Sequence, residues 1–140
     1  MPGKVPKHLE GVAHPSPGDN VGLVLRQRDV RLAYATSVAS LDGFAARFEN
    51  ATCLLFDGTF YASDELARLG IEGGSAEDMA HLPVGGANGS LHALSSLSVK
   101  RRIYTHVNNT NPMLMRRSPE RAAVGRAGWE IAFDGMEVLP

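Results

Sequence analysis

The sequence predicts an α/β (α+β) fold in which helices pack on one face of a mixed sheet. Three apolar runs after residue 50 look like buried strands, at 51–56, 102–107 and 129–133. Helical patterns separate these runs, and a strand–helix–strand order implies parallel strands with helices packed on the sheet. Near the start, 21–25 and 31–35 look like a hairpin joined by the polar turn 26–29, which adds an antiparallel pair.

Four segments between the strands carry helix signals. The first, 40–48, has apolar residues on one face at helical spacing, and 63–70 is a short helical pattern with a glycine stop. The third, 90–98, places three leucines on one face. The fourth, 118–128, begins with the strongest signal: a capping serine at Ser118, then a proline and an acidic residue in the first turn.

Two segments lack a regular pattern. Residues 1–20 are rich in proline and glycine and are expected to form an extended lead-in. Residues 71–90 are rich in glycine, so a long loop is expected there. The remaining organisation fits one domain over 21–140.

Composition excludes several classes of protein. The 140 residues carry a formal net charge of −1, so no basic field argues for nucleic acid. The single cysteine, Cys53, lies in an apolar run; this excludes a disulfide framework and favours a reducing, cytoplasmic compartment. No signal peptide is readable, and no run reaches the length that a membrane span needs.

Two polar side chains fall at the carboxyl ends of predicted buried strands. Asp57 follows the run 51–56, and His106 ends the next strand, just before a loop rich in asparagine. Ligands gather at this edge of an α/β sheet, so Asp57 and His106 could share a divalent metal or act as a base and its orienting partner. The alternative is structural: Asp57 would cap the next turn, and His106 would bond to a loop carbonyl.

Other polar residues could reach the same edge. His81 lies in the glycine-rich loop and could serve as an acid–base group, although a lone loop histidine is more often a surface residue. Asn108, Asn109 and Asn111 could bond to a substrate, or could satisfy backbone groups of their own loop. His14 lies ahead of the first predicted strand.

Several segments appear together in an order that resembles a known family. They are 2–6, 18–23, 56–60, 81, 89–91, 105–112, 118–124, 127–130 and 134–137. Together they resemble the carboxyl-terminal half of the pyrroloquinoline quinone (PQQ) biosynthesis protein B family. The resemblance covers nearly the whole chain, and its asparagine-rich segment and its Gly-Trp-Glu and Asp-Gly-Met-Glu segments are the most specific parts.

The resemblance implies a metallo-β-lactamase-like αββα sandwich with a metal at the sheet edge, of which 21–140 would form half. It implies a role in PQQ biosynthesis, through iron-dependent hydroxylation of a tyrosine in a peptide precursor; the bound metal would be iron (or zinc). The alternative is a non-catalytic carrier that transports PQQ or its precursor. His106 would be a metal ligand, His81 an acid–base histidine and Asp57 its carboxylate partner or a further ligand. His14 takes roughly the place of another ligand of the wider superfamily.

Two departures from the pattern matter. The superfamily's His-x-His-x-Asp-His cluster does not occur in this sequence, and Ser37 stands where related hydrolases often carry a bridging aspartate. Metal sites of this kind need three or more protein ligands. The sequence therefore leaves open an inactive fragment that needs a partner chain, and half a sandwich predicts an exposed apolar sheet face covered by a homodimer or a second chain.

Overall fold

The computed structural model describes residues 5, 9, 11–14, 16 and 20–139. Most of the expected lead-in, residues 1–20, lies outside the described residues. The strands are β1 (Leu23–Gln27), β2 (Val30–Ala35), β3 (Cys53–Asp57), β4 (Arg101–Thr105) and β5 (Trp129–Ile131). The helices are α1 (Glu65–Arg68), α2 (Ser90–Ala93) and α3 (Pro119–Arg126), with short 3-10 helices η2 (Ala45–Phe48) and η3 (Pro112–Leu114).

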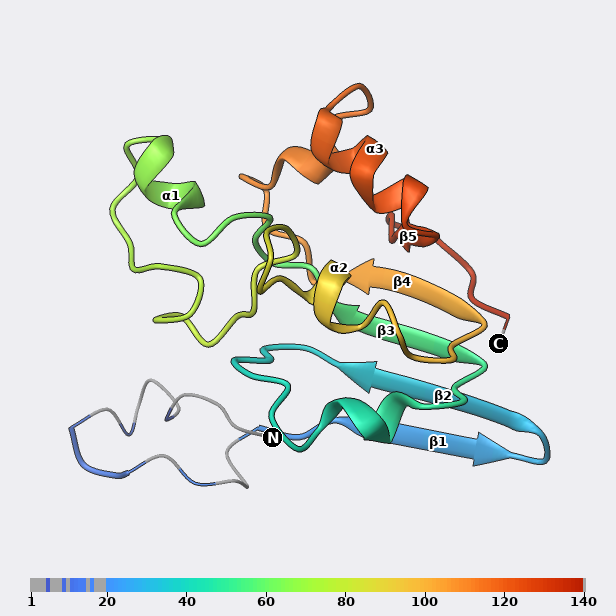
Figure 1. Ribbon diagram of the computed structural model, residues 1–140. Coiled ribbons are helices and arrows are strands. Elements are labelled where there is room, and N and C mark those ends of the chain that lie inside the picture. The colour runs from blue at the N-terminus through green and yellow to red at the C-terminus, as the bar shows by residue number, and fades with distance from the viewer. Residues whose placement is uncertain (1–4, 6–8, 10, 15, 17–19, 140) are drawn as a thin grey trace.

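The five strands form one mixed sheet in the order β1-β2-β3-β4-β5 (Figure 1). β1 and β2 are antiparallel, whereas β2, β3, β4 and β5 run parallel to one another. The expected mixed sheet is therefore confirmed. The carboxyl ends of the parallel strands meet at one edge, and α1 and the loop after it lie beyond that edge.

The hairpin is tighter than the sequence suggests. The ladder between β1 and β2 continues to the pair Gln27–Val30, so only Arg28 and Asp29 remain in the loop. Arg28 has a φ of 51°. A positive φ at this position suits the tight two-residue turns whose twist matches that of the strands.

The helices between the strands are shorter than their apolar patterns predict. The expected helix 90–98 ends at Ala93, and the hydroxyl of Ser95 donates to the carbonyl of His92 at 2.7 Å. Serine side chains offer the backbone such an alternative to helical bonding, which explains the early end. α3 follows its prediction, since the Ser118 hydroxyl accepts a hydrogen bond from the Arg121 amide.

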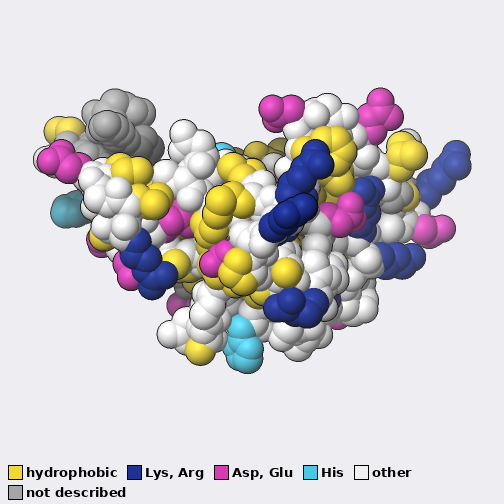
Figure 2. Space-filling view, turned by 90° about the horizontal axis from the view of Figure 1, so that it is seen from above, with side chains coloured by type: hydrophobic (Ala, Val, Ile, Leu, Met, Phe, Trp, Pro, Cys, Tyr) yellow, Lys and Arg dark blue, Asp and Glu magenta, His cyan; other side chains and the backbone are white. Residues whose placement is uncertain are grey.

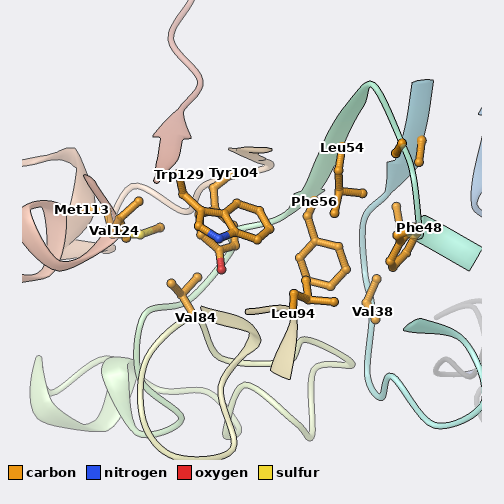
Figure 3. Packing of buried hydrophobic residues seen from close by; sticks show 13 residues of the cluster. Val38, Phe48, Leu54, Phe56, Val84, Leu94, Tyr104, Met113, Val124 and Trp129 are labelled. Carbon is orange, nitrogen blue, oxygen red and sulfur yellow. The ribbon is translucent and has the colours of Figure 1, made fainter. Parts of the chain in front are cut away.

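The hydrophobic core lies on one face of the sheet. Alternate residues of the central strands, including Leu54, Phe56 and Tyr104, are fully buried there. Tyr104 stacks on Trp129 with ring centroids 4.2 Å apart, and Phe56 lies near Leu94 of the segment after α2 (Figure 3). We call this side the covered face.

The opposite side carries apolar residues on β1 and β2 that stay exposed. Leu23 pairs with Tyr34, and Leu25 pairs with Leu32, so these four side chains share one face, away from the core. Leu23, Leu25 and Tyr34 are 52%, 59% and 38% exposed. We call this side the open face. Seen from above, the outline of the molecule is hollowed between two lobes (Figure 2).

Within the described part of the chain, no helix has the length and apolar character that crossing a membrane requires.

Candidate metal and acid–base site

The carboxylate of Asp57, the last residue of β3, is the fixed centre of the site. It is fully buried. Its Oδ2 accepts hydrogen bonds from the Val38 amide at 3.0 Å and from Nδ1 of His81 at 2.7 Å. Its Oδ1 accepts from the amide and the hydroxyl of Thr59, at 3.2 and 2.6 Å. Four donors therefore surround one carboxylate.

These donors keep Asp57 ionised. Burial alone would raise the pKa of this carboxyl, but the hydrogen bonds from His81, Thr59 and Val38 outweigh burial and hold the pKa below its ordinary value. An ionised carboxylate only accepts hydrogen bonds. The Nδ1 atom of His81 must therefore carry the proton of their shared bond, and in the neutral imidazole the lone pair is then on Nε2.

His81 is held firmly for a residue in a long loop. Its amide donates to the carbonyl of Ala76 at 2.8 Å, and its side chain is only 10% exposed. The ring packs edge-on against Phe60, with centroids 5.8 Å apart. The loop therefore presents His81 to the sheet edge in one orientation.

His106 follows β4 directly and is the accessible member of the site. Its backbone has a φ of 55°, and its side chain is half exposed. Nδ1 lies 2.8 Å from the Thr59 hydroxyl. That hydroxyl makes its shortest contact with the Asp57 carboxylate, and charge-assisted bonds are the stronger ones, so it donates to Asp57 and accepts from Nδ1 of His106. The Nε2 lone pair of His106 is then free as well.

The sheet edge thus brings three predicted residues together. Ligand atoms of Asp57, His81 and His106 all lie within 4.8 Å of one another. The ring centroids of His81 and His106 are 5.5 Å apart. Because Asp57 already accepts four hydrogen bonds, its first effect is to orient the two histidines, as carboxylates do behind metal-bound imidazoles. His14, which is exposed, does not belong to this group.

The three asparagines occupy different positions. Asn111 is buried; its amide donates to the carbonyls of Gly58 and Thr59, and its oxygen accepts from the Met113 amide. It fastens the two loops that follow β3 and β4. Asn108 bonds within its own loop, to Thr110 and to the Asn109 amide. Asn109 is exposed, and it lines the cavity that contains His106.

Two residues of the site were not predicted. Thr59 links Asp57 to His106, and the buried Glu65 accepts hydrogen bonds from Tyr61 and Thr110, which ties α1 to the asparagine loop. An acid at the start of a helix can reach back to a preceding amide, and this was the available signal for Glu65. The hydroxyl of Thr59 carries no comparable signal in the sequence.

Comparison with known proteins decides the family. The sequence model of the β-lactamase superfamily domain matches residues 4–107. The chain belongs to the β-lactamase superfamily. Curated relatives are named coenzyme PQQ synthesis protein B. The protein from Methylobacterium radiotolerans is 40% identical over 142 residues, which cover 99% of this chain and 48% of the relative. That from Pseudomonas putida is 42% identical over 127 residues, covering 89% and 42%.

A solved structure agrees with both the fold and the resemblance. The crystal structure of Zn²⁺-bound PqqB from Methylobacterium extorquens matches with a TM-score of 0.79 and 37% identity, covering 82% of this chain and 42% of that one. The expected superfamily fold and the resemblance to protein B are thereby confirmed. This chain spans about half the length of the curated relatives that it matches.

Proposed function

We propose that this chain serves the biosynthesis of PQQ as part of a metal-dependent hydroxylase that acts on a tyrosine of a peptide precursor. The observation that carries the proposal is the buried Asp57, which holds His81 beside His106 at the sheet edge. The same chain is about 40% identical to proteins named for PQQ synthesis. The similar PqqB structure is Zn²⁺-bound, which supports metal binding.

The side chains at the sheet edge supply part of a metal site. Imidazole is a ligand type of non-haem iron oxygenases, and of the three residues here His106 is the one that is accessible to a metal. In our proposal His106 binds iron or zinc through Nε2, with Asp57 behind it. The remaining ligands come from the part of the relatives that this chain does not cover. Bound iron would supply the activation of dioxygen that hydroxylation of an aromatic ring needs.

The chain's own residues handle the proton and the substrate. His81 keeps its Nδ1 proton on Asp57, so its Nε2 can accept the proton of the tyrosine hydroxyl. In the overall reaction, one oxygen atom of dioxygen enters a ring C–H bond. The other leaves as water, which takes up two electrons from an external reductant and two protons from the solvent. Asn109 and its neighbours line the approach to His106.

Metal analysis tests the proposal. We expect the chain to bind iron or zinc in complex with a polypeptide that corresponds to the uncovered part of the relatives, and His106→Ala to abolish this binding. His81→Asn should keep the metal but lose turnover. If His81→Asn also releases the metal, His81 is a ligand and not the base. If the isolated wild-type chain retains no metal, independent catalysis is excluded and a second chain is needed; binding of PQQ without metal would favour the carrier function instead.

The exposed apolar residues of the open face are evidence for a second chain that covers it. The exposed leucines of this face, Leu23 and Leu25, lie on the side of the sheet that the described helices do not cover. The relatives are about twice as long, so they hold a further segment of similar size. We propose that a polypeptide corresponding to that segment covers the open face. Co-expression of the two and light scattering test this: a stable one-to-one complex supports it, whereas a homodimer or a well-behaved monomer contradicts it.

A further inference from the structure

The large open cavity that contains His106 extends well beyond the three residues of the site. Its volume is about 1110 Å³. It extends from the end of β4 to the residues that follow η3 and β5. Its lining residues are Thr105, His106, Val107, Asn109, Leu114, Arg116, Arg121, Ile131, Ala132, Phe133 and Asp134.

One part of the lining is apolar and exposed. Leu114 and Phe133 are 44% and 68% exposed, and Val107 and Ile131 are half-buried beside them. Exposed apolar side chains within a concave site suit a flat hydrophobic group, and an aromatic ring is such a group.

The other part of the lining is positively charged. Arg121 is half-buried, and its Nη1 donates to the Met113 carbonyl at 2.9 Å, which fixes the guanidinium on the cavity wall. Arg116 is exposed, and among the described residues it has no ion-pair partner. Asp134 also lines the cavity, but it forms no ion pair with either arginine. Two guanidinium groups against one carboxylate favour an anionic ligand.

We propose that this cavity binds the substrate peptide and that Arg116 and Arg121 pair with a carboxylate of that peptide. The inference rests on the proposed function, because it takes the tyrosine peptide as the ligand. The aromatic ring lies along the apolar wall toward His106, and the carboxylate lies against the arginines, since guanidinium groups recognise carboxylates with matched donor geometry. The carboxylate is either an acidic side chain or the peptide's own carboxyl terminus.

Peptide titration calorimetry tests the proposal on the whole chain. The probe is a short peptide, blocked at both ends, with one tyrosine and one glutamate; the comparison peptide has glutamine instead. We expect Arg116→Gln to weaken binding of the glutamate peptide by about tenfold and to leave the glutamine peptide unchanged. Arg117→Gln is the matched control, because Arg117 is the adjacent exposed arginine and does not line the cavity. Arg121→Gln should also weaken the glutamate peptide, and its folding is checked by thermal unfolding.

The two possible sources of the carboxylate are separated by a third peptide. This peptide carries glutamine and a free carboxyl terminus. If this third peptide binds more tightly than the blocked glutamine peptide, and Arg116→Gln removes that difference, the carboxylate that the arginines bind is the carboxyl terminus. Equal binding of all three peptides, equal effects of the Arg116 and Arg117 variants, or no saturable binding would overturn the inference. Metal binding by the complex, measured with the same variants, separates this failure from failure of the proposed function.

Discussion

The two faces of the sheet differ although the same strands build them. On the covered face, Leu54, Phe56 and Tyr104 are fully buried. On the open face, Leu23, Leu25 and Tyr34 of the first hairpin remain exposed, whereas Ile103 in the centre of the sheet is buried. Apolar, strand-forming residues occur on both faces, so residue type does not explain why one face is buried and part of the other is exposed. The difference lies in what packs against the strands: the described residues provide a layer for one face and leave the β1–β2 end of the other without one.

The largest expected effect is on the covered face. Phe56 has no exposed surface and contacts the rings of Phe48, Tyr104 and Trp129 edge-on. We expect Phe56→Ala to lower the free energy of unfolding by about 3–5 kcal/mol, since it removes a buried ring and leaves a cavity. Urea unfolding followed by circular dichroism measures this. Leu25→Ala on the open face is the control, and equal losses in the two variants would contradict the asymmetry.

The second largest effect is expected at Asp57, the last residue of β3. Asp57→Asn replaces a carboxylate oxygen by an amide group that faces hydrogen-bond donors, so we expect a loss of about 2–3 kcal/mol at neutral pH. The pKa of Asp57 is lower in the folded chain than its ordinary value of about 3.9. The wild-type stabilisation is therefore present above about pH 4 and is lost as the pH falls through the folded pKa. The variant should lack this part of the acid dependence, and unfolding curves from pH 3 to 7 that run parallel for both proteins would contradict the assignment.

A smaller loss of stability is expected when the buried hydroxyl of Tyr104, on the covered face, is removed. The hydroxyl of Tyr104 lies 2.9 Å from that of Ser90, and both residues are fully buried. Burial raises the pKa of Tyr104, which therefore stays neutral over the working range of pH. Tyr104→Phe keeps the stacking on Trp129 but leaves Ser90 unpaired, at a cost of about 1–2 kcal/mol in thermal unfolding. Tyr34→Phe, on the open face, should change little, and a loss as large as that of Tyr104→Phe would contradict this view.

Local patterns predicted the sheet better than they predicted the helices and the site. The continuous apolar run 51–56 and the Ser118 cap identified β3 and α3, because both signals act over neighbouring residues. The leucine spacing of 90–98 did not show that the Ser95 hydroxyl would help end α2 after one turn. No local pattern indicated that the glycine-rich loop would bring His81 onto Asp57, 24 residues away.

The asparagines of 108–111 also show that local sequence does not predict which contacts a single residue makes. Residue type alone does not separate Asn111, which is buried and fastens two loops, from Asn109, which lines the cavity beside His106. That distinction depends on which backbone carbonyls the fold leaves without partners, since buried polar groups must be paired. The predicted substrate contact of all three asparagines stays a prediction, with Asn109 placed best for it.

The smallest expected effect on stability tests the open face itself. Leu25→Ser should change the free energy of unfolding by only about 0.5 kcal/mol, because the side chain is already mostly exposed. It should nevertheless weaken association with a partner chain, since a polar group would then lie within the apolar contact. Val24→Ser is the matched control: Val24 is on the same strand, 41% exposed, and pairs with Ala33 of the covered face. Sedimentation or light scattering of mixtures measures both variants, and if Val24→Ser weakens association as much as Leu25→Ser does, the partner approaches the edge of β1 and not the open face.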